Sequence, residues 1–258
     1  MLVISERVNG QFTAVGKAID ARDPKVLQDL AEAQVKAGAN ALDINTGPGM
    51  ENAPEVMKWM VESVQEVVDI PLCIDTTDPA AMEAGVKAAK TTPIINSTTA
   101  DNWKMEKLFP IAKEYNAEII GLTLDEKGIP NDAEKRCEHA MMIITKAMEY
   151  DVGPDKIYLD PLILPVGPAQ DQGKKVLDAL DMFKTLCDPA PKTVVGLSNV
   201  SNNAKERSLL NTTYCVMLMA HGLDAAIMDP ADDQLMRAIK TSDILLNNRL
   251  YADDFLRV

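Results

Sequence analysis

Short apolar runs bounded by turn-forming residues recur along the chain, and a segment with helical spacing or capping signals follows most of them. We interpret eight of these runs as strands: Leu2–Ser5, Ala41–Asn45, Pro71–Asp75, Pro93–Asn96, Glu118–Thr123, Lys156–Asp160, Thr193–Asn199 and Asp224–Met228. Most are continuously apolar, as expected of strands that are covered on both faces of a parallel sheet. Eight alternations predict an α/β fold with a single (β/α)8 TIM barrel over residues 1–258, and a doubly wound open sheet is the alternative.

Helix boundaries support this division. The apolar positions of one predicted helix follow helical spacing, with one small polar member: Val56, Trp59, Met60, Ser63, Val64 and Val67. Asp23-Pro24, Asp78-Pro79 and Asp229-Pro230 each combine an N-cap residue with proline at the first helical position. Gly38 suits the C-terminal stop of the helix that begins after Asp23.

Polar residues stand at or just past the end of each predicted strand: Glu6, Asn45, Asp75, Asn96, Thr123, Asp160, Asn199 and Asp229. In a closed barrel, the carboxyl ends of all strands meet at one mouth, which is where barrel enzymes keep their sites. Carboxylates and carboxamides are costly to bury without a ligand or mutual hydrogen bonds. This ring therefore predicts a polar recognition site.

Several members of the ring also have a purely structural explanation. Asp229 is best explained as a helix N-cap, and Thr123 as a β-forming residue. Glu6 could form an ion pair with Arg7, and Asn45 could serve the turn that follows it. No capping role is evident for Asp75, Asn96, Asp160 and Asn199, which follow strongly apolar runs.

Composition narrows the class of protein. The chain is 47% hydrophobic and 25% charged, as in an ordinary globular protein, and its formal charge of -13 argues against nucleic-acid binding. No apolar run approaches the ~18 residues of a membrane span, and no signal peptide precedes the first strand, so we expect a soluble, cytoplasmic protein. The cysteines and histidines are scattered, so we expect neither disulfides nor a protein-ligated metal: Cys73, Cys137, Cys187, Cys215, His139 and His221.

Six motifs at these strand ends occur in an order that resembles a known family. They are Ile4-Ser5-Glu6-Arg7-Val8-Asn9-Gly10, Leu42-Asp43-Ile44-Asn45-Thr46-Gly47, Cys73-Ile74-Asp75-Thr76-Thr77, Ile95-Asn96-Ser97-Thr98, Leu159-Asp160-Pro161-Leu162-Ile163-Leu164-Pro165 and Gly196-Leu197-Ser198-Asn199-Val200-Ser201. The series is similar to the pterin-binding methyltransferases that act on methyltetrahydrofolate and a corrinoid protein. These include the acetogen corrinoid/iron–sulfur protein methyltransferases and the methyltransferase components of anaerobic O-demethylase systems.

The resemblance implies the roles of individual residues. It places Asp75, Asn96, Asp160, Asn199, Asn202 and Arg207 around the folate, with Glu6, Asp43, Asn45, Gly196 and Ser198 as possible additional contacts. Arg207 could instead form a surface ion pair with Glu206 or another acid. Asn199 is the expected contact to N5, and Asp160 could order the water that delivers a proton there. Both count as candidate catalytic residues.

The resemblance also implies the substrates and partners. We expect methyl transfer between N5 of methyltetrahydrofolate and the cobalt of cobalamin, a corrinoid supplied by a partner protein. The loops Thr46–Gly49 and Pro161–Pro168 could form the docking rim. We further expect a homodimer, and the direction of transfer stays open. A dihydropteroate synthase-like pterin transferase is one alternative, although the Arg-x-His of those enzymes near the last strand is missing. A non-catalytic folate-binding module is another.

Overall fold

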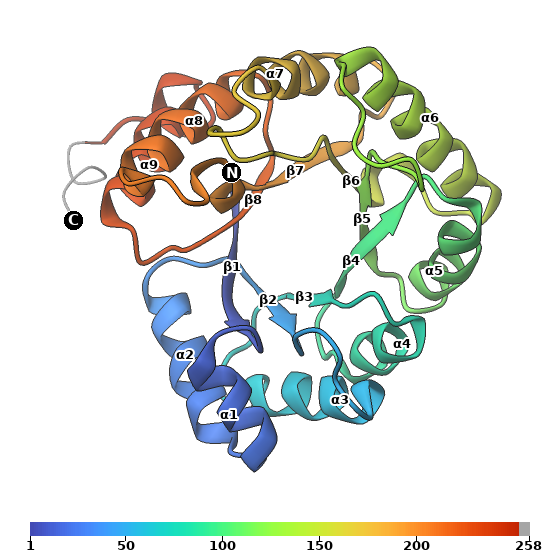
Figure 1. Cartoon of the computed structure of the whole chain (residues 1–258), viewed down its shortest axis with the longest axis vertical. Helices are drawn as coiled ribbons and strands as arrows, with labels where there is room; N and C mark the ends of the chain where they lie inside the picture. The colour runs from blue at the N-terminus through green and yellow to red at the C-terminus, as the bar shows by residue number, and fades with distance from the viewer. Residues whose placement is uncertain (253–258) are drawn as a thin grey trace.

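Eight parallel strands close into a barrel, and helices surround it on all sides (Figure 1). The computed structural model describes residues 1–252. The strands are β1 (Leu2–Asn9), β2 (Ala41–Asn45), β3 (Leu72–Asp75), β4 (Ile94–Thr99), β5 (Glu118–Leu122), β6 (Ile157–Asp160), β7 (Lys192–Gly196) and β8 (Ala225–Met228). Each strand pairs in parallel with the next, and β8 pairs with β1. The predicted (β/α)8 barrel is confirmed, and the open sheet is wrong.

The helices follow the strands along the chain, with two of them between β1 and β2 and the last one after β8. They are α1 (Thr13–Ala21), α2 (Pro24–Lys36), α3 (Ala53–Val64), α4 (Pro79–Ala88), α5 (Asn102–Glu114), α6 (Ala133–Glu149), α7 (Gln172–Phe183), α8 (Arg207–Ala220) and α9 (Asp233–Leu245), with short 3-10 turns η1 (Pro154–Lys156) and η2 (Leu197–Ser201). The first helix after each strand begins near the barrel mouth, because it follows the carboxyl end of that strand, whereas α2 follows α1.

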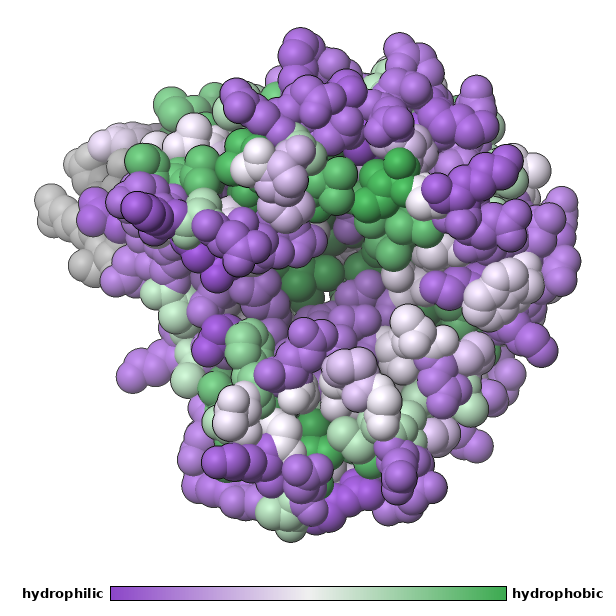
Figure 2. All heavy atoms as spheres, in the orientation of Figure 1, coloured by the Kyte–Doolittle hydropathy of each residue, from purple (hydrophilic) through white to green (hydrophobic). Residues whose placement is uncertain are grey.

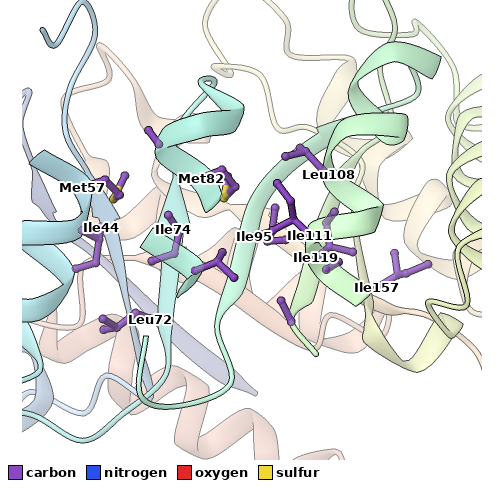
Figure 3. Packing of buried hydrophobic residues seen from close by; sticks show 14 of the residues in the cluster. Ile44, Met57, Leu72, Ile74, Met82, Ile95, Leu108, Ile111, Ile119 and Ile157 are labelled. Atoms are coloured by element: carbon purple, nitrogen blue, oxygen red, sulfur yellow. The ribbon is translucent and has the colours of Figure 1, made fainter. Parts of the chain in front are cut away.

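Strand alternation divides the apolar residues into two layers. One residue from each strand forms an inner cluster: Ile4, Ala41, Cys73, Ile94, Ile120, Tyr158, Val194 and Ala225. Neighbours that point the other way, such as Ile44, Ile74 and Ile119, pack against Met57, Met82 and Leu108 of the helices (Figure 3). Because both faces of each strand are buried, the strands are continuously apolar in sequence.

Most predicted helix boundaries are confirmed. Asp23 caps α2 by accepting a hydrogen bond from the Lys25 amide at 3.0 Å, and Asp78 caps α4 through the Ala80 amide at 2.9 Å. Gly38 follows α2 with a φ of 107°, a conformation that glycine adopts easily. On α3, Val56 and Met60 of the predicted stripe are buried.

The predicted N-cap at Asp229 is wrong. Helix α9 begins at Asp233, and its cap is Asp232, whose side chain accepts a hydrogen bond from the Leu235 amide at 3.1 Å. Asp229 instead accepts from the Ala231 amide at 3.0 Å, which forms a local turn around Pro230.

The predicted seventh strand is too long. Strand β7 ends at Gly196, and residues 197–201 form η2. Leu197 and Val200 are both buried, and this three-residue spacing matches one 3-10 turn. The sequence therefore stays largely apolar beyond Gly196, although the backbone changes from a strand to a 3-10 turn. Conversely, β1 and β4 extend beyond the predicted ends, so Glu6 and Asn96 lie within strands.

Candidate active site

The inner apolar layer is followed, one step closer to the mouth, by a polar layer on five of the eight strands. Successive inward positions on a strand are two residues apart, so Glu6, Asp43, Asp75, Asn96 and Asp160 follow the five inner residues Ile4, Ala41, Cys73, Ile94 and Tyr158. On β5, β7 and β8, the same level is occupied by Leu122, Gly196 and Ile227. Strands β1 to β4 therefore form a polar side of the mouth, whereas Asp160 on β6 stands between Leu122 and Gly196. In Figure 2, both hydrophobic and hydrophilic residues border the central hollow, while much of the outer surface is hydrophilic.

Two carboxamides on the polar side are each held by an acid. Asn45, Asp75 and Asn96 are register partners on β2, β3 and β4. The Asn45 amide donates to Asp75 Oδ2 at 2.5 Å, and its Oδ1 accepts from the Gly47 amide at 2.7 Å. The Asn96 amide donates to Asp43 Oδ1 at 3.1 Å. These bonds fix the orientation of both carboxamides before any ligand arrives. Beside Asp75 opens a cavity of about 300 Å³, between the loops that follow β1, β2 and β3.

Burial changes the charge state of these acids. Asp43 is 3% exposed, and burial together with the nearby Asp75 raises its pKa well above the usual value. Burial also raises the pKa of Asp75, although the Asn45 amide opposes that shift. The pKa of Glu6 is raised by burial as well, with the hydrogen bond from Ser198 acting against it. A carboxyl with a raised pKa can change its protonation state when a ligand binds.

Asp160 is the most strongly held acid of the site. Its side chain is buried, and Oδ1 accepts a hydrogen bond of 2.7 Å from the Leu162 amide. Its carbonyl accepts two bonds from Thr123, one from the amide and one from Oγ1, each at 3.0 Å. Burial raises the pKa of Asp160 to about 7, and the Leu162 amide and the Arg136 guanidinium oppose the shift. The carboxyl thus titrates near neutral pH.

The segment after β7 brings several predicted residues together. Asn199 is exposed on η2, and a β-carbon at Gly196 would lie 2.9 Å from its Nδ2. Ser198 Oγ donates to Glu6 Oε1 at 2.8 Å, which joins this segment to β1. The Asn202 amide donates to the Asn199 carbonyl at 3.2 Å. Asn199 and Asn202 thus present their side chains from one short turn beside Glu6.

Arg207 and Arg7 do not form the ion pairs considered from the sequence. Arg207, at the start of α8, donates from Nε to Ser201 Oγ at 3.1 Å and from Nη2 to the Ser198 carbonyl at 3.5 Å. Among residues 1–252, Arg207 has no acid within ion-pair distance. Arg7 pairs with Asp229, with Nε 3.6 Å from Oδ2, rather than with Glu6. Arg207 therefore stabilises the turn that carries Asn199.

One group of residues behind the site was not found from the sequence. Arg136 and His139 on α6 are buried and reach toward the ends of β5 and β6. The available signal was a charged residue on the otherwise apolar face of a helix, shared with Ala140, Ile143 and Ala147. Among the residues that the structure describes, no three His, Cys, Asp or Glu side chains are grouped to hold a metal, and no helix is long and apolar enough to cross a membrane.

Comparisons with known proteins agree with this geometry. The family model described as pterin binding enzyme matches residues 12–229. The methylcorrinoid:tetrahydrofolate methyltransferase of Eubacterium limosum is 33% identical over 250 residues, which cover 96% of this chain and 92% of that protein. The methionine synthase of Mycobacterium leprae is 28% identical over 88% of this chain, which spans 20% of its length.

A solved structure shares the fold at low sequence identity. The Yersinia pestis DHPS with a pterine-sulfa conjugate superposes with a TM-score of 0.72 at 15% identity, over 96% of this chain and 94% of that one. At that identity, the match supports the barrel fold alone. The family model and the E. limosum relative, by contrast, each match most of this sequence. The chain therefore belongs to the pterin-binding enzyme family.

Proposed function

We propose that this protein transfers a methyl group between N5 of methyltetrahydrofolate and the cobalt of a corrinoid. The proposal rests on the arrangement of the barrel mouth. Hydrogen bonds orient its acids and carboxamides, and the exposed Asn199 side chain lies on the turn that follows β7. The relationship to the E. limosum methylcorrinoid:tetrahydrofolate methyltransferase over nearly both whole chains supports the same reaction.

The polar side of the mouth suits the edge of a pterin ring. That edge carries a 2-amino group, ring N–H groups and a carbonyl. Carboxylates such as Asp75 and Asp160 accept from adjacent N–H donors, while the carboxamide of Asn96 can match a donor–acceptor pair. The apolar residues Leu122 and Ile227 at the same level can contact the ring face. Asn202 and Arg207, which follow β7, would contact the more polar parts of the folate.

Methyl transfer from folate requires that N5 become a good leaving group. When the N5–methyl bond breaks, its electron pair stays on nitrogen, so a proton on N5 makes the departing group a neutral amine. The electron pair of the new methyl–cobalt bond comes from the reduced corrinoid, the second substrate. Asn199 provides a hydrogen bond at N5, by accepting from the protonated amine or by donating in the transition state. Asp160 orders the water that brings the proton.

We also propose how the corrinoid is supplied, in which oligomeric state the enzyme acts and where in the cell it acts. The corrinoid is cobalamin bound to a separate protein, and it approaches the barrel mouth across the loops 46–49 and 161–168. The enzyme acts as a homodimer in the cytoplasm. The relationship to the E. limosum methylcorrinoid:tetrahydrofolate methyltransferase supports a corrinoid as the second substrate. Light scattering of the purified protein tests the dimer, and a molar mass of one chain would exclude it.

The direct test is anaerobic. Purified protein is mixed with methyltetrahydrofolate and cob(I)alamin, and the cobalt absorbance is followed; the reverse reaction starts from methylcobalamin and tetrahydrofolate. Catalysed conversion in either direction supports the proposal. Binding of methyltetrahydrofolate without conversion, even with a corrinoid protein, would favour a folate-binding module. Formation of dihydropteroate from its precursors, without any need for cobalt, would favour the synthase-like alternative.

A further inference from the structure

Arg136 is a buried cation close to the mouth. It lies in the first turn of α6 and is fully buried. Nη2 donates to Gln172 Oε1, at the start of α7, at 2.9 Å, while Nε and Nη1 have no hydrogen-bond partner among residues 1–252. Burial lowers the pKa of Arg136. A buried guanidinium with free donors is costly, so its charge must be compensated by groups around it.

Three ionisable groups interact electrostatically with this guanidinium. They are Asp132 at the N-cap of α6, Tyr214 of α8 and Asp160 of β6. Asp132 is exposed, so water screens its interaction with the cation. Tyr214 donates its hydroxyl proton to the Gly173 carbonyl at 2.7 Å. Asp160 is the buried acid among them, and its carboxyl titrates near neutral pH, where a change in the charge of Arg136 alters its protonation.

A chain of hydrogen bonds connects the helix that carries Arg136 to Asp160. One turn after Arg136, His139 Nδ1 lies 3.2 Å from the Thr123 carbonyl, and its Nε2 lies 3.4 Å from Asp125 Oδ2. Thr123 in turn donates twice to the Asp160 carbonyl. Helix α6 is thus connected to the Asp160 backbone through Thr123, and Arg136 is buried one turn earlier on the same helix.

We propose that Arg136 is a positioning residue of the folate site, which acts from behind the barrel wall to keep the Asp160 side chain in its charged form. The inference rests on the proposed function, because it is the pterin N–H groups that require an accepting carboxylate. Arg136 itself does not touch the ligand. Its effect is electrostatic, and Gln172 holds the guanidinium in place for it.

Loss of the Arg136 charge should weaken folate binding at neutral pH. Burial alone raises the pKa of Asp160, and Arg136 limits the increase. Without the guanidinium, most Asp160 side chains would be protonated at pH 7, and a protonated carboxyl offers a donor where the pterin also offers donors. Folate affinity would then fall at neutral pH and recover at alkaline pH.

Two variants change the charge in different ways. Arg136→Met removes the guanidinium but keeps an unbranched side chain. Gln172→Glu keeps Arg136 in place and sets a carboxylate against it, so it neutralises the cation without emptying the space. Arg136→Lys preserves the charge. The matched control is Lys146→Met, which removes a partly exposed cation farther along α6.

The first measurement is an NMR titration of ligand-free protein with 13C-labelled aspartate carboxyls, in which Asp160→Asn identifies the Asp160 signal. We expect the Asp160 midpoint to rise by about one pH unit in Arg136→Met and Gln172→Glu, and to stay unchanged in Lys146→Met. The corresponding loss of methyltetrahydrofolate affinity is about fivefold at pH 7 and nearly absent at pH 9. Arg136→Lys should resemble the wild type.

Each contrary result has a distinct meaning. An unchanged Asp160 midpoint in Gln172→Glu and Arg136→Met would overturn the proposal, and so would a loss of affinity that is equal at pH 7 and pH 9. If the midpoint moves but wild-type protein does not bind methyltetrahydrofolate, the electrostatic coupling stands, whereas its role in folate binding and the proposed function both fail.

Discussion

Gly196 leaves the space that the Asn199 side chain occupies. A β-carbon at Gly196 would lie 2.9 Å from Asn199 Nδ2, closer than carbon and nitrogen atoms approach without displacement. The backbone of Gly196 has a φ of -78°, which any residue adopts. Glycine is therefore required here for the approach of the amide and not for the conformation of the chain.

The substitution Gly196→Ala should displace the Asn199 amide and spare the fold. Because the crowded atom is the end of a side chain, we expect the free energy of unfolding to change by no more than about 1 kcal/mol. Misplacing a reacting group by about 1 Å can cost about 100-fold in rate, so methyl transfer should fall by 10–100-fold. The matched control is Gly173→Ala on α7, where the nearest atom to a β-carbon would be the Tyr214 hydroxyl oxygen at an ordinary 3.9 Å. Equal effects of the two changes would contradict the assignment.

Asn199 should affect turnover far more than folate binding. Loss of one preorganised hydrogen bond to the reacting centre typically costs ~2.7–4 kcal/mol, which is 10²–10³ in rate. We expect Asn199→Ala to lose that much kcat, measured with methyltetrahydrofolate and cob(I)alamin, while the folate Kd changes by less than about threefold. A loss of affinity as large as the loss of turnover would refute the role at N5.

The variant Asn199→Asp distinguishes the two ways in which the amide can act. A carboxylate accepts hydrogen bonds but does not donate them. If the side chain accepts from a protonated N5, Asn199→Asp should retain much more activity than Asn199→Ala. If it donates in the transition state, the two variants should be equally impaired. Comparing kcat for both variants at pH values above 7, where an exposed aspartate is ionised, decides between them.

Asp160 should make folate binding depend on pH near neutrality. Its pKa in the free protein is about 7, and N–H donors of the ligand favour the ionised form. Affinity should therefore increase as pH rises through 7, with release of a proton at lower pH. Calorimetry in buffers of different ionisation enthalpy measures that release. Asp160→Asn should abolish it, whereas Asp155→Asn, at an exposed position before β6, should leave it intact.

The fold was largely predictable, because strand burial leaves a direct mark on the sequence. Runs such as Pro71–Asp75 are continuously apolar up to one polar residue, and the barrel mouth is where those polar residues meet. The prediction failed where a local sequence was compatible with two structures. Asp229 and Asp232 both suit a helix cap, and Leu197 and Val200 suit either a strand or a 3-10 turn.

The contacts that support the site from outside the barrel were less predictable from the sequence than the polar residues at the barrel mouth. Asp160 could be recognised as a strand-end acid, but its support by Thr123, His139 and Arg136 depends on which helix face packs behind β5 and β6. The bond between Ser198 and Glu6 joins residues 192 positions apart. Such contacts exist only after the barrel has closed, and no local pattern specifies them.

Asp43 should make the protein less stable as pH rises. Burial and the neighbouring Asp75 raise its folded-state pKa above the unfolded value of about 3.9. Between those two values the folded protein holds a proton that the unfolded chain has lost. The stabilising contribution is therefore complete below about pH 3.9 and is lost as pH increases through the folded-state pKa.

The variant Asp43→Asn removes this dependence while keeping the size of the side chain and an oxygen that can accept from Asn96. Each pH unit between the unfolded and folded pKa values corresponds to about 1.4 kcal/mol, so the variant should be more stable than wild type at pH 8 and nearly equal to it at pH 4. Urea unfolding at both pH values measures the difference. The exposed change Asp155→Asn serves as the control, and a variant that is less stable than wild type at pH 8 would show that the Asp43 carboxylate is fully compensated in the folded site.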